Sequence, residues 1–154
     1  MNDINERPIG IFDSGVGGLT VVRSVKKYLK NEDIVYFGDT ARVPYGNKSK
    51  STVIRFANEI MEFLVKHKIK MAVVACNTAS SFSLLSLKKR YNLPIIGVIN
   101  PGVKEAVRVT EKNSIGVIGT NSTISSGAYD REMKKIEKQK GVRVNDFAKR
   151  YGLK

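Results

Sequence analysis

The 154-residue sequence has a single cysteine, a single histidine and no tryptophan. One cysteine excludes an internal disulfide and any metal cluster built from several thiolates. The histidine, His67, lies between two lysines, and we expect it to be a solvent-exposed residue at the end of a helix. Without a second histidine, neither a His-based metal site nor a Cys–His catalytic pair is expected. This sparing use of cysteine is typical of proteins in the reducing cytoplasm.

Long hydrophobic runs are also missing. No apolar run approaches the roughly 20 residues that a membrane-spanning helix needs, so we expect no membrane partner. The polar, acidic stretch Met1–Pro8 is unlike a secretory signal. The hydrophobic content of 42% is normal for a globular protein and excludes a mostly disordered chain. The length fits one ordinary domain.

Basic residues outnumber acidic ones 27 to 14, which gives a net charge of +13. Such an excess either binds nucleic-acid phosphates or simply keeps the surface hydrated. The densest region, Arg131–Lys154, interleaves nine basic residues with three acids, as the solvated face of a helix does. No aromatic residues alternate with the basic ones as base-stacking platforms would. We therefore expect no nucleic-acid partner.

Short runs rich in valine and isoleucine recur, each followed by apolar residues at helical spacing. Strands that are apolar on both faces and alternate with helices predict an α/β fold, a parallel sheet with flanking helices. The predicted strands are Ile9–Phe12, Ile34–Phe37, Met71–Ala75, Ile95–Ile99 and Ser114–Ile118. The predicted helices are Val21–Leu29, Ser51–His67, Ala79–Tyr91, Val103–Val109 and Ser126–Lys140. The segment 141–154 fits this alternation poorly and has room for a short edge strand and a turn of helix.

Polar residues follow every predicted strand. In parallel α/β sheets, ligands bind outside the carboxyl ends of the strands. The residues at these ends are Asp13 and Ser14, Gly38–Thr40, Cys76–Thr78, Asn100 and Thr120. The sequence therefore predicts a binding site at this edge of the sheet.

The glycine-rich loop Gly15–Gly18 lies between a strand and a helix, where backbone N–H groups can bind phosphate. The P-loop pattern fails because no Lys-Ser/Thr pair follows. The dinucleotide pattern fails because Thr20 stands in place of the third glycine. Asp39 is placed as a ribose-binding acid would be, whereas Asp13 would put a carboxylate beside the phosphate. A nucleotide-binding α/β module using this loop stays open as the alternative function.

Cys76 closes the third predicted strand and precedes Asn77 and Thr78, which are good helix N-cap types. Its sulfur is then near the positive end of a helix dipole, where the thiolate is favoured. A buried structural cysteine is equally compatible with the local sequence. Tyr45, in Pro44-Tyr45-Gly46, is either a packing residue or a wall and hydrogen-bond donor for a ligand.

Four motifs, in order, resemble those of glutamate racemases, in the aspartate/glutamate racemase superfamily. They are Ile11–Val21, Val43–Gly46, Ala75–Ser80 and Ile115–Tyr129, and the resemblance spans about Pro8 to Lys135. It implies a racemase-like fold, with residues 1–98 as an incomplete, flavodoxin-like first lobe, 99–140 as the start of a second, and 141–154 as an atypical tail. It also implies cofactor-independent conversion of L-glutamate to D-glutamate for bacterial peptidoglycan, with no metal, and allows a homodimer of the intact enzyme.

The resemblance implies roles for individual residues. Cys76 matches the cysteine that takes the α-proton from D-glutamate and returns it, and Asp13 matches a residue that helps this thiol to exchange its proton. The implied substrate-binding residues are Asp13, Ser14, Tyr45, Gly46, Asn77, Thr78, Thr120 and Thr123.

One departure from the family concerns the chemistry. Inverting a stereocentre needs an acid/base group on each face of the carbon. The family supplies the second one from a later Cys-Thr-His segment, and its chain then returns to complete the first lobe. These 154 residues hold neither. We therefore expect a truncated chain that is poorly stable and does not racemise glutamate alone. Single-cysteine decarboxylase-like relatives keep the later cysteine, so they match less well.

Overall fold

The computed structural model describes residues 4–111, 114–140 and 146–151. Its strands are β1 (Ile9–Asp13), β2 (Ile34–Gly38), β3 (Met71–Val74), β4 (Ile95–Gly97), β5 (Ser114–Gly119) and β6 (Asp146–Tyr151). Its α-helices are α1 (Leu19–Tyr28), α2 (Lys50–Lys66), α3 (Asn77–Arg90), α4 (Ile99–Val109), α5 (Asn121–Ser125) and α6 (Ala128–Lys140). Two short 3-10 helices are η1 (Ile4–Glu6) and η2 (Tyr45–Asn47). No helix in the described ranges has both the length and the apolar character needed to cross a bilayer.

The first sheet has four parallel strands in the order β2-β1-β3-β4. All five residues of the central strand β1 are buried. Ile9 of this strand pairs with Ile34 of β2 on one side and with Met71 of β3 on the other. The predicted parallel sheet with flanking helices is therefore confirmed.

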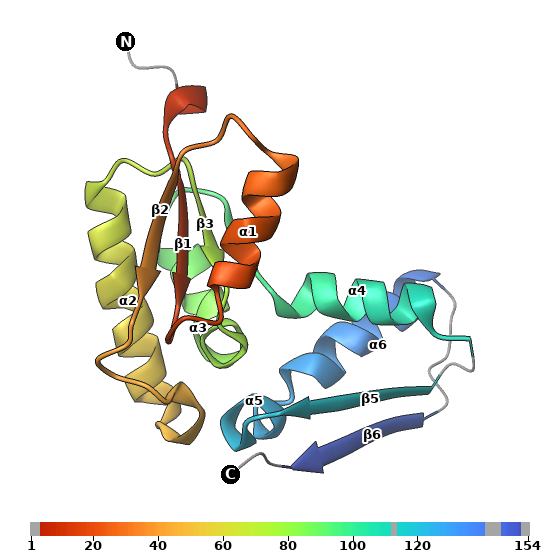
Figure 1. Cartoon of the computed structure of the whole chain (residues 1–154). Coiled ribbons are helices and arrows are strands. Elements are labelled where there is room, and N and C mark those ends of the chain that lie inside the picture. Colours follow the sequence, from red (N-terminus) through yellow and green to blue (C-terminus); the bar gives the residue numbers. More distant parts are fainter. Residues whose placement is uncertain (1–3, 112–113, 141–145, 152–154) are drawn as a thin grey trace.

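Helices α2 and α3 cover one face of this sheet and form its core. Figure 1 shows α2 and α1 on opposite sides of the strands. The predicted inward stripe of α2 is buried, with Val53, Ile60 and Leu64 packed near Phe12 of β1. The helix begins after Ser49, whose hydroxyl accepts the Thr52 N–H at 3.1 Å. This N-cap and the apolar stripe together explain where α2 starts and which face it buries.

Helix α1 lies on the opposite face of the sheet (Figure 1). No residue of α1 is fully buried, and Leu29, just after it, is 49% exposed. Strand alternation places Ile96 of β4 on this same face, opposite the core residue Ile95, and Ile96 is 45% exposed. Parallel sheets ordinarily bury both faces. The exposure of Ile96 therefore means that this face is incompletely covered.

A second, two-stranded sheet is formed by β5 and β6, which run parallel with Ser114 opposite Asp146. Helices α4 and α6 pack together beside it (Figure 1), and their shared core includes Val103, Met133 and Ile136. The tail 141–154 contains β6, a short strand of the kind for which it had room, whereas residues 141–145 and 152–154 lie outside the described residues. The change of sheet falls after β4, but division into lobes at residue 98 stays a prediction.

Two helix predictions need correction. Helix α4 begins at Ile99 and not near Val103, so Asn100 lies inside a helix and not in a loop after a strand. The predicted helix Ser126–Lys140 is α6, which begins at Ala128 directly after Gly127, a residue with a φ of +65°, and the short helix α5 before it was not predicted. Apolar spacing missed both boundaries because α4 begins without a side-chain cap and a left-handed glycine precedes α6, and neither feature changes the hydrophobic period.

Two leucines of α3 give a matched test of the core. Leu87 is fully buried and Leu85 is 75% exposed. We expect Leu87→Ala to lower the free energy of unfolding by about 2–5 kcal/mol, because it leaves a cavity. Leu85→Ala should change it by no more than about 0.5 kcal/mol. Urea unfolding followed by circular dichroism measures both, and equal effects would contradict this packing.

Candidate functional site

A cavity of about 560 Å³ lies where the carboxyl ends of β1, β3 and β5 meet. Its volume is in the range of small-molecule sites, roughly 300–1,000 Å³. Every catalytic or substrate-binding residue that the resemblance implies lines it, whereas Gly38–Thr40 and Asn100, also expected at this edge, do not; the lining members are Asp13, Ser14, Tyr45, Gly46, Cys76, Asn77, Thr78, Thr120 and Thr123. The other lining residues are Gly17, Thr20, Val21, Val43, Pro44, Ala75, Val98, Ile118, Gly119 and Tyr129. The structure thus gathers the predicted residues, from segments far apart in sequence, around one space.

Cys76 is itself the N-cap of α3, a position expected for Asn77 or Thr78. Its sulfur accepts the Ala79 N–H at 3.4 Å. The thiol also lies 3.3 Å from the Ser14 hydroxyl, to which it donates in this arrangement. The residue is 6% exposed and borders the cavity. The sulfur therefore lies at a helix N-terminus, beside the cavity, with one N–H donor and one hydroxyl as its neighbours.

Asp13 occupies the anion-binding position of the glycine loop. Its Oδ2 accepts the N–H of Gly18 at 3.0 Å and that of Gly15 at 3.2 Å. Because this buried carboxylate already accepts two N–H groups of the loop, a phosphate there would have to displace it and would be repelled by its charge. The alternative function, a nucleotide-binding module using Gly15–Gly18, is therefore not supported.

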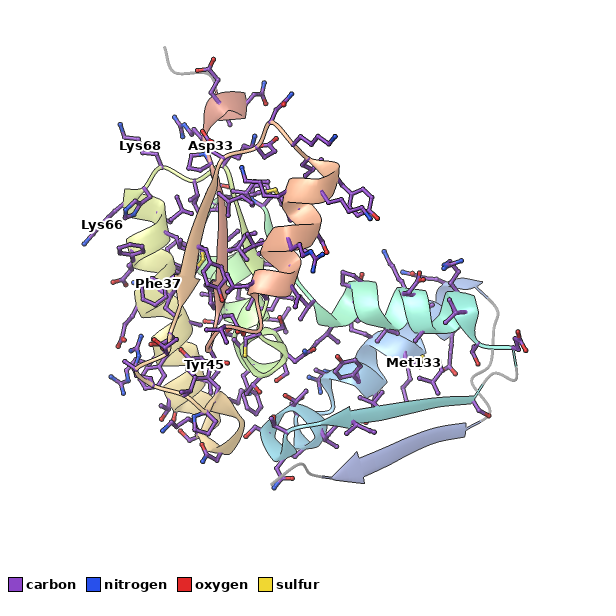
Figure 2. The ribbon with its side chains drawn as sticks, viewed as in Figure 1. Asp33, Phe37, Tyr45, Lys66, Lys68 and Met133 are labelled. Carbon is purple, nitrogen blue, oxygen red and sulfur yellow. The ribbon has the colours of Figure 1, made fainter. Side chains whose placement is uncertain are left out.

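Tyr45 forms a wall of the cavity, and its hydroxyl is already engaged. Figure 2 shows its place at the end of the first sheet that faces α5. The hydroxyl donates to the buried carboxylate of Asp39, and Arg42 also donates to Asp39, from Nε at 2.8 Å. Burial, and then the hydrogen bond to Asp39, raise the pKa of Tyr45 well above its ordinary value. Asp39 is thus not a ribose ligand at the cavity but a partner behind its wall.

Three threonine hydroxyls connect the two sheets. Thr78, in the first turn of α3, lies 3.1 Å from Thr120 and 2.9 Å from Thr123, oxygen to oxygen. Thr120 is the N-cap of α5 and lies 3.0 Å from Thr123. The sequence suggested each threonine separately, but it gave no sign that they form one cluster.

Two contacts between the sheets were missed from the sequence. Tyr129 of α6 donates its hydroxyl to the Asn77 side-chain oxygen at 2.7 Å. Ser122 of α5 donates to the Gly46 carbonyl at 2.6 Å. Tyr129 belongs to the last of the four motifs, which was a usable signal. A single serine such as Ser122 has no feature in the sequence that would indicate its contact with Gly46.

Gly46 lies directly against the side chain of Thr120. A Cβ at this position would lie 2.5 Å from the Cβ of Thr120, so any side chain would push α5 away. Glycine is therefore required here by close approach and not by a special backbone angle.

Two further predicted residues lie elsewhere. Asn100 does not line the cavity, because α4 directs its amide to Glu132 at 2.8 Å. His67 caps the end of α2, exposed, with Nδ1 2.9 Å from the Phe63 carbonyl, as expected. Within the described ranges, no three His, Cys, Asp or Glu side chains are grouped so that they could hold a metal ion.

Comparison with known proteins gives a consistent result. A model of the family described as Asp/Glu/Hydantoin racemase matches residues 9–148. The chain is 52% identical over 132 residues to a glutamate racemase of Oceanobacillus iheyensis, an alignment covering 86% of this chain and 48% of that protein.

Solved structures agree with this comparison. The glutamate racemase of Aquifex pyrophilus superposes with a TM-score of 0.86 at 49% identity, over 94% of this chain and 53% of that one. The glutamate racemase of Francisella tularensis in complex with D-glutamate gives 0.82 at 38% identity, over 96% and 53%. The chain spans about half the length of the curated relatives it matches.

Gly46 and Gly102 form a matched pair of substitutions. Gly46→Ala should lower the free energy of unfolding by about 1–3 kcal/mol, because its Cβ would overlap Thr120. A methyl group at Gly102, inside α4, would instead meet open space, so Gly102→Ala should raise stability by about 0.5–1 kcal/mol. Urea unfolding of both variants measures this, and a neutral Gly46→Ala would contradict the close approach.

The raised pKa of Tyr45 has a consequence at alkaline pH. An unfolded tyrosine ionises near pH 10, whereas the folded state keeps Tyr45 protonated to higher pH. Its contribution to stability is therefore full below about pH 10 and is lost as pH rises above that value. Tyr45→Phe removes this dependence. We expect the free energy of unfolding, from urea titrations between pH 8 and 11, to fall less steeply with pH in the variant. Identical slopes would contradict the buried hydroxyl contact.

Proposed function

The chain belongs to the Asp/Glu/Hydantoin racemase family, and from this we propose that its cavity binds glutamate and that Cys76 exchanges the α-proton on one face of the substrate. The observation that carries the proposal is the placement of Cys76 at the N-terminus of α3, bordering the cavity, beside Ser14 and the Ala79 N–H.

The other acid/base groups of the cavity lining are less suited to this role. Tyr45 and Tyr129 donate their hydroxyls to Asp39 and Asn77, and burial raises the pKa of each tyrosine. Asp13 accepts two backbone N–H groups. A thiol is a common acid/base group in enzymes and Cys76 supplies the thiol of this lining, so Cys76 is the best candidate for proton transfer.

The lining also fits an amino acid with two carboxylates. Among its described residues no lysine or arginine is present, so substrate carboxylates would be held by neutral donors. The hydroxyls of Ser14, Thr78 and Thr120 and the N-terminus of α3 supply such donors. Asp13 is the anionic lining residue and would pair with the substrate ammonium. The Francisella tularensis relative, in complex with D-glutamate, supports this substrate class.

The proposed step is a proton transfer. The Cys76 thiolate takes the α-proton of D-glutamate, the C–H bond breaks, and its electron pair stays on the α-carbon, delocalised into the carboxylate. If the same thiol returns the proton, D-glutamate is re-formed, because the proton arrives on the face it left. Formation of L-glutamate needs a donor on the opposite face, and the sequence holds no second cysteine. We therefore propose that this chain, by itself, exchanges the proton without racemisation.

The finer expectations from the resemblance stay predictions. They are that the D-glutamate made by the intact enzyme enters peptidoglycan synthesis, that the reaction needs no cofactor, that the protein works in the cytoplasm, and that the intact enzyme forms homodimers. The substrate-binding roles given to Asp13, Asn77 and the threonines are predictions as well.

Incubation in D2O tests the proposal. With purified chain, D-glutamate should gain deuterium at the α-carbon, measured as loss of the α-proton signal by NMR, while chiral chromatography finds no L-glutamate. L-glutamate should stay unlabelled. Cys76→Ala should lower the exchange rate by at least about 100-fold, the scale of a lost acid/base group.

The Cys76→Ala protein, purified in the same way, also controls for contaminating racemase from the expression host. Equal exchange in both preparations would contradict the role of Cys76. Turnover to L-glutamate by the wild-type chain, lost in Cys76→Ala, would contradict the one-face mechanism while leaving the cysteine assignment in place.

A further inference from the structure

Behind the cavity wall, the loop between β2 and α2 contains charged groups that the proposed chemistry does not use. Asp39 is 4% exposed and lies outside the cavity lining. Its carboxylate accepts Nε of Arg42 with both oxygens, at 2.8 and 3.0 Å, and also accepts the Tyr45 hydroxyl. A buried carboxylate is costly unless it is paired and hydrogen-bonded, and Asp39 is both.

Arg42 connects this carboxylate to α2. Its guanidinium also donates to Glu59 and lies 4.1 Å above the ring of Phe56. The Tyr45 ring packs on the same phenylalanine, with centroids 5.6 Å apart. The loop is therefore held against α2 at Arg42 and at Tyr45, both of which donate to Asp39.

The other side of the loop faces the second sheet. Gly46 directly follows Tyr45, and its carbonyl accepts the Ser122 hydroxyl at 2.6 Å. Its backbone is so close to Thr120 that even a methyl group would not fit. Any displacement of Tyr45 would consequently move α5. The hydroxyls of Thr120 and Thr123, which line the cavity, would move with this helix.

We propose that Asp39 is a positioning residue: by holding the Tyr45 hydroxyl and Arg42 together, it fixes the wall of residues 43–46 against α5 and so sets the width of the cavity. A packing role alone would not require a buried charge, because an apolar side chain of similar size fills space at lower cost. A carboxylate, however, accepts from both donors at once and gives each a single direction.

Nuclear magnetic resonance of the 154-residue chain tests this placement. In Asp39→Asn the loss of charge weakens the contact with Arg42, and the backbone amide signals of Gly46 and Ser122 should shift. Tyr45→Phe removes only one hydroxyl and should shift the same two signals. The double variant should shift them no further than Asp39→Asn, because both changes act through one contact.

Glu62→Gln is the matched control. It breaks an exposed pair between α2 and Arg90, 2.6 Å in length, that touches no part of the wall. Its Gly46 and Ser122 signals should stay at the wild-type positions. If Asp39→Asn lowers the Tm but leaves both signals unmoved, the residue is merely structural and the proposal is overturned. If Asp39→Asn does not fold, Tyr45→Phe decides, and unmoved signals in that variant overturn it equally.

The link to substrate rests on the proposed function and is measured separately. D-glutamate should slow iodoacetamide labelling of Cys76, and Asp39→Asn should raise the concentration needed for half-protection about tenfold, or about 1.4 kcal/mol. Half-protection at the wild-type concentration, with displaced Gly46 and Ser122 signals, would overturn the effect of the wall on binding. If D-glutamate does not protect the wild-type chain, the proposed function fails, while the amide signals still decide the role of Asp39.

Discussion

The carboxylate of Asp13 holds together the loops on which the rest of the site depends. Its Oδ2 accepts the N–H groups of Gly15 and Gly18 and so fixes the start of α1. The main-chain carbonyl of the same residue accepts the Asp39 N–H at 2.9 Å. One buried residue at the end of the central strand therefore places Ser14 beside Cys76 and also anchors the neighbouring loop that leads to Tyr45. Its negative charge would also repel a phosphate from the glycine loop.

Short polar contacts between the two sheets form the other side of the cavity. Hydroxyl groups at the N-termini of α3 and α5 meet at about hydrogen-bond distance, and the Gly46 backbone touches α5. These side chains have few rotatable bonds, so ordering them costs little conformational entropy. A site made from threonine, serine and glycine is accordingly well defined without large anchoring residues.

Much of the fold could be predicted from the sequence, because valine- and isoleucine-rich runs alternate with helical spacing and because strand ends carry the polar residues. That rule singled out Asp13, Cys76 and Thr120, which do border one cavity, although Thr120 follows a strand of the second sheet. It failed for Asn100, since a helix that starts early is invisible to apolar periodicity. The contacts of Asp39 could not be predicted either: a loop acid next to a tyrosine and an arginine has many partners in principle, and only the packing of α2 selects among them.

The incompletely covered face of the first sheet has a consequence for how the molecules behave toward one another. Leu29 and Ile96 remain about half exposed on a chain that carries a net charge of +13. Contact between two such faces would gain about 25 cal/mol for each Å² of apolar area removed from water, while the like charges repel. Salt screens that repulsion over about 8–10 Å at moderate ionic strength and leaves the apolar gain intact. We therefore expect added salt to favour association of these chains and dilute buffer to oppose it.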